Sequence, residues 1–108
     1  MSDELSAEVL DRGADVLITL TGELDFGTSA AFLETAQPFA EAGRTVVLDL
    51  DHLTFCDSSG LGTLVRLHQA GEAAGGSLVL ARPRPQLEST IKVTMLHRLL
   101  TLVSEVPG

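Results

Sequence analysis

Two adjacent hydroxyls, Ser58 and Ser59, lie where the sequence changes from a strand-like to a helix-like pattern. An apolar run over residues 46–50 precedes them, and apolar residues spaced at i, i+3, i+4 and i+7 follow. We therefore expect Phe55–Gly62 to be a loop that brings both hydroxyls to the start of a helix, with Asp57 or Ser58 as its N-cap. The unpaired N–H groups and the positive dipole end of such a helix favour an added anion. A serine in this position suits a phosphate and can be reached by another protein.

The residues of this octet also have simpler structural interpretations. Ser58 could be a plain helix N-cap. Asp57 could cap the helix and interact with its dipole, or it could orient the Ser58 hydroxyl or hold a residue of a kinase, and these roles are compatible. Gly60 and Gly62 have no Cβ, so another surface can approach the backbone closely there. The residue types alone leave a structural site and a modified site both open.

The spacing of the reactive residues argues against several other chemistries. Val65 stands where the third glycine of a dinucleotide fingerprint would be, and the sequence has no Gly-Lys-Ser/Thr run. Cys56 and Asp57 precede Ser58, so the Gly-x-Ser-x-Gly pattern of a hydrolase nucleophile is absent. The three histidines are widely separated, with no paired ligand at metal-binding spacing. We therefore expect no enzyme activity, no cofactor and no metal.

Charge and composition also restrict the class of partner. The 108 residues are 44% hydrophobic and are expected to form one domain over residues 1–108, with a core over about residues 5–103. A net charge of −8 opposes nonspecific binding to nucleic acid and adsorption to an anionic membrane. The single Cys56 permits no internal disulfide and is interpreted as a small buried hydrophobe. Since no apolar stretch reaches the ~18 residues of a membrane span, we expect a cytoplasmic protein.

Hydrophobic periodicity predicts the elements that would position this octet. In the N-terminal half we expect a hairpin formed by the strands Leu5–Val9 and Asp15–Thr21, with the loop Asp11–Ala14 between them. A turn at Gly22–Asp25 should follow, and then a helix from Thr28 or Ser29 to about Gly43. Either hydroxyl at the start of that helix can cap it. Pro38 lies inside the helix, where it removes one hydrogen bond and usually kinks the axis.

The C-terminal half continues with alternating strands and helices. The expected elements are the strand Thr45–Leu50, a helix over Ser59–Ala74, the strand Ser77–Ala81, a helix carrying Leu87, Ile91, Met95 and Leu96, and a last strand over Leu99–Val103. The first of these is the most apolar and should be central and buried on both faces. Arg82 and Arg84 alternate with prolines and are interpreted as a solvated turn. This order predicts an α/β fold with a mixed sheet of four to five strands and three to four helices.

Two motifs resemble those of a known family. The hexapeptide Asp57–Gly62 looks like the signature of the STAS domain, in the branch of bacterial anti-sigma-factor antagonists. The segment Leu20–Asp25 resembles the Gly-Glu-Leu-Asp turn of the same family. The distance between the motifs also fits, and the resemblance runs from about Leu5 to Val103. It implies the STAS-like α/β fold.

The resemblance also implies which residues act. The first serine of the family motif is phosphorylated, which places the modification on Ser58. The family counterpart of Asp25 lies near that site and helps to bind the partner. The residues expected to bind a partner are Asp25, Asp57, Ser59, Gly60, Leu61 and Gly62. The sequence departs from the family in Thr94–His97, where Met95 occupies the position of a glycine.

A binding switch is the function that the resemblance implies. The unphosphorylated chain would bind an anti-sigma factor that is also a serine kinase and so release a sigma factor. Phosphorylation of Ser58 would end this binding, and a phosphatase would restore it. An alternative is a ligand-sensing or scaffold STAS module whose Ser58 is never phosphorylated. A third hypothesis, a small serine hydrolase, has no general base in reach by motif.

Overall fold

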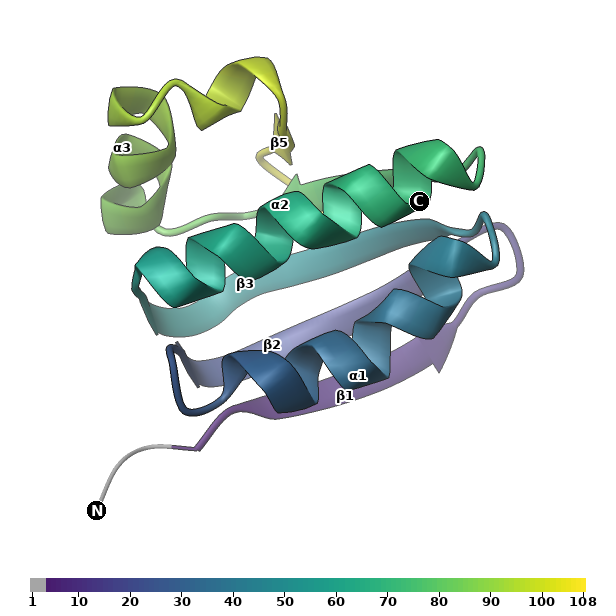
Figure 1. Cartoon of the computed structure of the whole chain (residues 1–108), viewed down its shortest axis with the longest axis horizontal. Helices are drawn as coiled ribbons and strands as arrows, with labels where there is room; N and C mark the ends of the chain where they lie inside the picture. Colours follow the sequence, from purple (N-terminus) through teal and green to yellow (C-terminus); the bar gives the residue numbers. More distant parts are fainter. Residues whose placement is uncertain (1–3) are drawn as a thin grey trace.

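The computed structural model describes residues 4–108, so the predicted domain of residues 1–108 begins with three residues outside this description. Five strands form one sheet in the order β1-β2-β3-β4-β5. The elements are β1 (Ser6–Asp11), β2 (Val16–Leu24), α1 (Ser29–Glu41), β3 (Thr45–Cys56), α2 (Ser58–Ala73), β4 (Ser77–Ala81), α3 (Pro85–Val93), the 3-10 helix η1 (Leu96–Arg98) and β5 (Thr101–Val103). Figure 1 shows α1 and α2 side by side on one face of the sheet. The predicted α/β fold with a mixed sheet is confirmed.

The sheet combines one hairpin with three parallel pairings. β1 and β2 are antiparallel, with Val9 opposite Ile18, whereas β2 with β3, β3 with β4 and β4 with β5 are parallel. The hairpin loop closes through the Arg12 N–H, which donates to the Asp15 carbonyl at 2.8 Å. Because each parallel connection crosses over through a helix, the carboxyl ends of β2 and β3 and the first turns of α1 and α2 meet at one edge.

The core lies between the sheet and its helices. Residues 46–50 of β3 are all buried, which confirms the prediction of a central strand covered on both faces. Phe32 of α1, Leu64 of α2 and Leu48 of β3 belong to one apolar cluster, which Ile91 of α3 also joins. Within residues 4–108, no helix has the length and apolarity that crossing a lipid bilayer requires.

The predicted turn at Gly22–Asp25 is wrong in its position. β2 continues to Leu24, which is fully buried and pairs with Cys56 of β3. Gly22 has a φ of +112°, and the register with β3 shifts between Gly22 and Glu23. Glycine therefore marks a bulge inside the strand and not its end, because it alone adopts this backbone conformation without strain.

The predicted loop at Phe55–Gly62 is also shorter than expected. β3 runs through Cys56 and α2 begins at Ser58, so Asp57 alone connects the strand to the helix. The strand extends because β2 extends beside it and supplies a pairing partner for its last residues. The strand Ser77–Ala81 is confirmed at both ends.

Helix α1 passes through Pro38 and ends where the sequence predicted. The proline is exposed, whereas Ala36 and Ala40 on either side of it are buried and hold the helix on the sheet. The Pro38 carbonyl still accepts a bond from the Ala42 N–H at 3.0 Å. Gly43 follows the helix with a φ of +76°, the left-handed conformation that favours glycine after a helix end.

The last predicted helix is too long. α3 ends at Val93, and Met95 has a φ of +66°, so the chain leaves the helix there. Leu96 belongs to η1, and β5 begins at Thr101 instead of Leu99. The family resemblance places a glycine at Met95, and the left-handed backbone at this residue explains why glycine suits the position.

Candidate modification and docking site

The site lies at the edge of the sheet where β2 leads into α1 and β3 leads into α2. These two connections touch, because the Asp57 N–H donates to the Leu24 carbonyl at 3.2 Å. The two sequence motifs, 20–25 and 57–62, are therefore neighbours in space although they are distant in the chain. The fold brings Asp25, Asp57 and Ser58 to one edge.

Ser58 is the first residue of α2, and its side chain is exposed. Its hydroxyl takes part in none of the side-chain hydrogen bonds found within residues 4–108. Helix α2 begins with its N–H groups directed at this end, which favours negative charge. Ser58 is thus exposed to solvent at the start of α2, and its hydroxyl has no hydrogen-bond partner among residues 4–108.

Asp57 is the N-cap of α2, which settles the choice between Asp57 and Ser58. Its Oδ1 accepts a hydrogen bond from the Gly60 N–H at 3.0 Å. Its Oδ2 accepts a second bond from the Phe26 N–H at 3.2 Å. Both bonds of the carboxylate go to backbone groups and neither goes to the Ser58 hydroxyl. Asp57 therefore joins the start of α2 to the loop before α1.

Asp25 holds the turn that begins α1. Its Oδ1 accepts bonds from the Gly27 N–H at 2.9 Å and the Thr28 N–H at 3.1 Å. The prediction that the hydroxyl of Thr28 or Ser29 caps α1 is wrong. Both hydroxyls donate to carbonyl oxygens instead, Thr28 to Glu23 at 2.8 Å and Ser29 to Asp25 at 2.6 Å. The Asp25 carboxylate, and not a hydroxyl, therefore accepts the hydrogen bonds of the backbone N–H groups that lead into α1.

The two glycines of the motif have different surroundings. Gly60 is buried, and a Cβ on it would lie 2.5 Å from the Leu24 carbonyl oxygen and 2.7 Å from Cys56 Sγ. Gly62 is exposed, and a Cβ on it would meet no atom within 4 Å. The close approach at Gly60 is therefore internal, against β2, whereas Gly62 leaves the outer face of α2 open to another molecule.

The remaining motif residues lie at the rim of the core. Ser59 is half-buried, and its carbonyl accepts a bond from the Thr63 hydroxyl at 3.1 Å. Leu61 packs against the apolar cluster while part of its side chain stays accessible. The structure thus places Ser58 and Gly62 on the outer surface of the first turns of α2, with Ser59 and Leu61 beside them.

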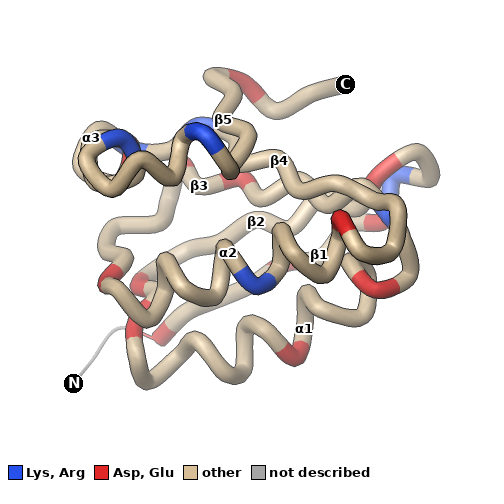
Figure 2. The backbone as a smooth tube through the Cα atoms, turned by 45° about the horizontal axis from the view of Figure 1, so that its top comes forward, with Lys and Arg blue, Asp and Glu red and all other residues tan. Residues whose placement is uncertain are grey.

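Charge at this end of the molecule is negative. In Figure 2, the loops that lead into α1 and α2 carry acidic segments, and no basic segment lies beside them in the described chain.

Burial, reinforced by the charge of Asp57, raises the pKa of the Cys56 thiol to about 12. Cys56 packs against the core and its thiol is neutral, but it is half-buried and not fully buried as the sequence predicted.

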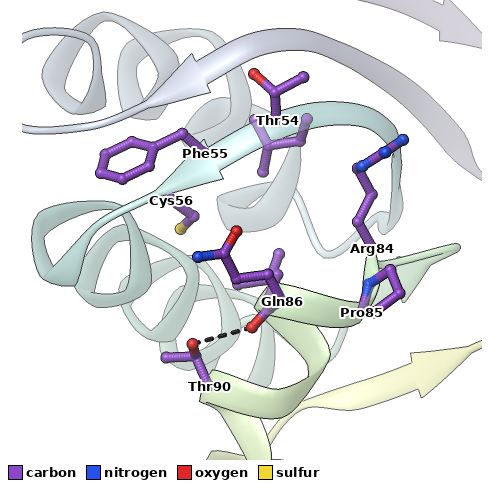
Figure 3. Close-up of a pocket in the computed structure, with 9 residues that line it drawn as sticks. Thr54, Phe55, Cys56, Arg84, Pro85, Gln86 and Thr90 are labelled. Carbon is purple, nitrogen blue, oxygen red and sulfur yellow. Dashed lines mark hydrogen bonds between the residues drawn. The ribbon is translucent and has the colours of Figure 1, made fainter.

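A pocket of about 220 Å³ lies beside the site, between the end of β3 and the start of α3. Figure 3 shows that Gln86 projects toward Cys56 across this space, while Arg84 and Pro85 form its other end. The Thr90 hydroxyl donates to the Gln86 carbonyl at 3.0 Å. Sequence reasoning did not find this pocket, because its two walls come from separate elements. Among the described residues, no group of acidic, histidine or cysteine side chains could hold a metal ion.

Arg82 is not the solvated turn residue that the sequence predicted. Its guanidinium forms two hydrogen bonds with the buried carboxylate of Asp49, at 2.7 and 3.0 Å. This pairing lowers the pKa of Asp49 below the ordinary carboxyl value. The Arg84 guanidinium reaches the Asp51 carbonyl at 3.1 Å. Both arginines therefore join the segment that follows β4 to residues of strand β3 by hydrogen bonds.

Comparison with known proteins gives the chain its family. The family model described as STAS domain matches residues 6–107. The anti-sigma-B factor antagonist of Bacillus subtilis (strain 168) is 25% identical over 104 residues, which are 96% of this chain and 95% of that protein.

Two solved structures share the fold. The Bacillus cell fate determinant SpoIIAA in its phosphorylated form has a TM-score of 0.70 and 25% identity, over 94% of this chain and 92% of that one. An anti-sigma factor antagonist from Mycobacterium paratuberculosis has a TM-score of 0.85 and 20% identity, over 95% of this chain and 88% of that one. With the family model matched from β1 to the residues after β5, this chain belongs to the STAS domain family.

Proposed function

We propose that this chain is an anti-sigma-factor antagonist that binds an anti-sigma factor serine kinase when Ser58 is unphosphorylated, and so releases a sigma factor. Phosphorylation of Ser58 switches this binding off. The observation that carries the proposal is the exposed Ser58 hydroxyl at the start of α2, next to Asp57 in the chain and without a hydrogen-bond partner among residues 4–108. The family membership and the Bacillus relatives support it.

The chain supplies the acceptor of the phosphoryl group and the docking surface. The kinase supplies ATP, the metal and the base. The Ser58 oxygen forms a bond to the γ-phosphorus, the bond to ADP breaks, and the hydroxyl proton passes to the kinase base. The chain itself acts as a regulatory binding protein, a role that its membership of the STAS domain family supports.

Added charge is the physical basis of the switch. A phosphoserine carries about −1.5 to −2 charges at neutral pH. At this edge it would add to the charges of Asp57 and Asp25, and Figure 2 shows no Lys or Arg segment of the backbone next to these loops within residues 4–108. An unpaired charge buried in the interface costs roughly 3–5 kcal/mol. This corresponds to a loss of affinity of about 100- to 3,000-fold.

The fold should survive the modification. Ser58 is exposed and begins a helix of 16 residues, a position that tolerates an anion. The solved structure of a phosphorylated relative supports this, because its fold matches that of the present chain. A phosphatase that removes the phosphate would therefore restore a docking surface that never unfolded.

Kinase assays with mapping of the phosphate test the proposal. The purified chain is incubated with Mg-ATP and each anti-sigma factor serine kinase of the same organism, and mass spectrometry locates the phosphate. We expect modification of Ser58 in the wild type and in Ser59→Ala, and none in Ser58→Ala. Transfer to another residue, or to none with every kinase, contradicts the proposal.

The pocket between β3 and α3 favours one alternative, a ligand-sensing or scaffold STAS module. Its walls combine apolar and polar groups, as small-molecule sites do. Native mass spectrometry of the purified chain distinguishes the two functions. A stoichiometric bound small molecule, together with an unmodified Ser58, would favour the sensing module.

A further inference from the structure

Phe26 is the most exposed large apolar residue of the described chain. Its side chain is 85% exposed, in the loop between β2 and α1. Phe55, at the end of β3, is 46% exposed and lines the pocket beside α3. An aromatic ring of this size buries about 150–250 Å² when it finds a partner, so the exposed Phe26 forgoes a large hydrophobic gain.

The loop presents this ring on a fixed backbone. The Phe26 N–H donates to Asp57 Oδ2 at 3.2 Å, and the next N–H groups, of Gly27 and Thr28, donate to Asp25 Oδ1. The Thr28 N–H and the Ser29 N–H also donate to the Asp25 carbonyl. A rigid turn loses little conformational entropy when its side chain is bound, which is the property of a preorganised anchor.

A hollow and acidic residues lie next to the loop that carries the ring, although Phe26 itself does not line the hollow. Asp25 and Gly27, the chain neighbours of Phe26, line an open hollow whose other wall includes Glu4 and Ala31. Figure 2 shows acidic segments at this edge and no basic one in the described chain. Apolar contact at Phe26 and negative charge beside it require a partner of complementary chemistry.

We propose that Phe26 is the anchor of the docking surface, and that it enters an apolar pocket of the partner kinase whose rim carries Lys or Arg side chains. This inference rests on the proposed function and adds to it the residue that gives most of the affinity. Because the carboxylate that caps α2 also holds the Phe26 backbone, a phosphate on Ser58 places its charge at the rim of the same contact.

Anchors of this kind dominate the affinity of an interface. Truncation of Phe26 to alanine should weaken binding of the unphosphorylated chain by about 30-fold or more, which is ~2 kcal/mol at 1.4 kcal/mol per decade. Phe26→Leu keeps apolar volume and should lose less. Both variants should fold as the wild type does, because the exposed ring makes little contact within the chain.

Calorimetric titration of the full-length chain against the kinase that phosphorylates it tests this inference. Val93→Ala is the matched control, because Val93 is 79% exposed at the last residue of α3 and belongs to neither loop of the site. The expected order of affinity is wild type and Val93→Ala, then Phe26→Leu, then Phe26→Ala. Circular dichroism melting of each variant establishes that the fold is intact.

The outcomes separate the anchor from the switch. If the wild type binds and Phe26→Ala binds within about 3-fold of it, the anchor is overturned and the proposed function stands. Equal weakening by Val93→Ala and Phe26→Ala would also overturn the anchor, because the loss would not be specific to the site. If the wild type binds no kinase of the organism, the proposed function and the anchor both fail.

Discussion

Asp57 and Phe26 are joined by a hydrogen bond of 3.2 Å between a carboxylate oxygen and a backbone N–H, across 31 positions of the sequence. The other oxygen of the same carboxylate caps α2 through the Gly60 N–H. One side chain therefore ties together the two loops that form the edge of the sheet. The position of Ser58 relative to the neighbouring loop depends on this link.

Removal of the Asp57 carboxylate should destabilise the chain. In Asp57→Ala the N–H groups of Gly60 and Phe26 lose their acceptors, and we expect a loss of about 1–3 kcal/mol in the free energy of unfolding. Asp57→Asn keeps one acceptor oxygen for the cap and should lose less. Urea denaturation measures both. Equal stability of the wild type and Asp57→Ala would show that the two bonds contribute nothing.

Gly60 and Gly62 should respond in opposite ways to the same substitution. Gly60→Ala places a methyl group 2.5 Å from the Leu24 carbonyl oxygen and should cost about 1–3 kcal/mol of stability. Gly62→Ala meets open space in a helix and should stabilise by up to about 1 kcal/mol. Thermal denaturation of the two variants gives the comparison. A tolerated alanine at Gly60 would contradict the close packing of α2 on β2.

The Asp49–Arg82 pair should contribute stability that depends on pH. Arg82 lowers the pKa of Asp49, so the contribution is present above the ordinary carboxyl range, about pH 4, and is lost as the pH falls through the lowered pKa. Arg82→Ala leaves a buried carboxylate without its partner and should cost about 1–3 kcal/mol near neutral pH, because the arginine is partly screened by solvent.

Denaturation at several pH values measures this contribution. The difference between the wild type and Arg82→Ala should shrink toward strongly acidic pH. Arg84→Ala is the control, since within residues 4–108 that guanidinium bonds to a backbone carbonyl and to no carboxylate, and its loss should show a small and pH-independent effect. A difference for Arg82→Ala that stays constant across the acidic range is incompatible with the ion pair.

The Cys56 thiol should be unreactive in the folded chain. With a pKa of about 12, almost none of it is thiolate at mildly alkaline pH, whereas a free thiol with a pKa near 8.5 is partly ionised. We expect alkylation by iodoacetamide to be at least ~100-fold slower in the native chain than in denaturant. Rapid native labelling would show that the thiol is neither desolvated nor neutral.

Local patterns predicted the elements whose burial is continuous. The strands at residues 45–50 and Ser77–Ala81 were predictable because their apolar runs are uninterrupted. The extension of β3 over residues 51–56 was not, since that stretch mixes polar and apolar residues and is ordered by its pairing with β2. The end of α3 was also missed, because the apolar spacing continues past Met95 while the backbone there turns left-handed.

The part of the site that lies within the single motif at residues 57–62 could be predicted from the sequence. A helix start with Ser58 as an exposed hydroxyl follows from the residues around it. The bond of Asp57 to Phe26 and the pairing of Arg82 with Asp49 join residues 31 and 33 positions apart, and only the folded chain shows them. The internal role of Gly60 also depends on β2, which no local pattern reveals.

We propose that charge on the Ser58 oxygen decides whether the partner binds. The most direct measurement is the dissociation constant for the kinase of the chain in its unmodified and its homogeneously Ser58-phosphorylated forms, with near-identical circular dichroism spectra as the control. We predict that phosphorylation weakens binding by about 100-fold or more. Affinities of the two forms that agree within about 3-fold would show that the phosphate does not control binding.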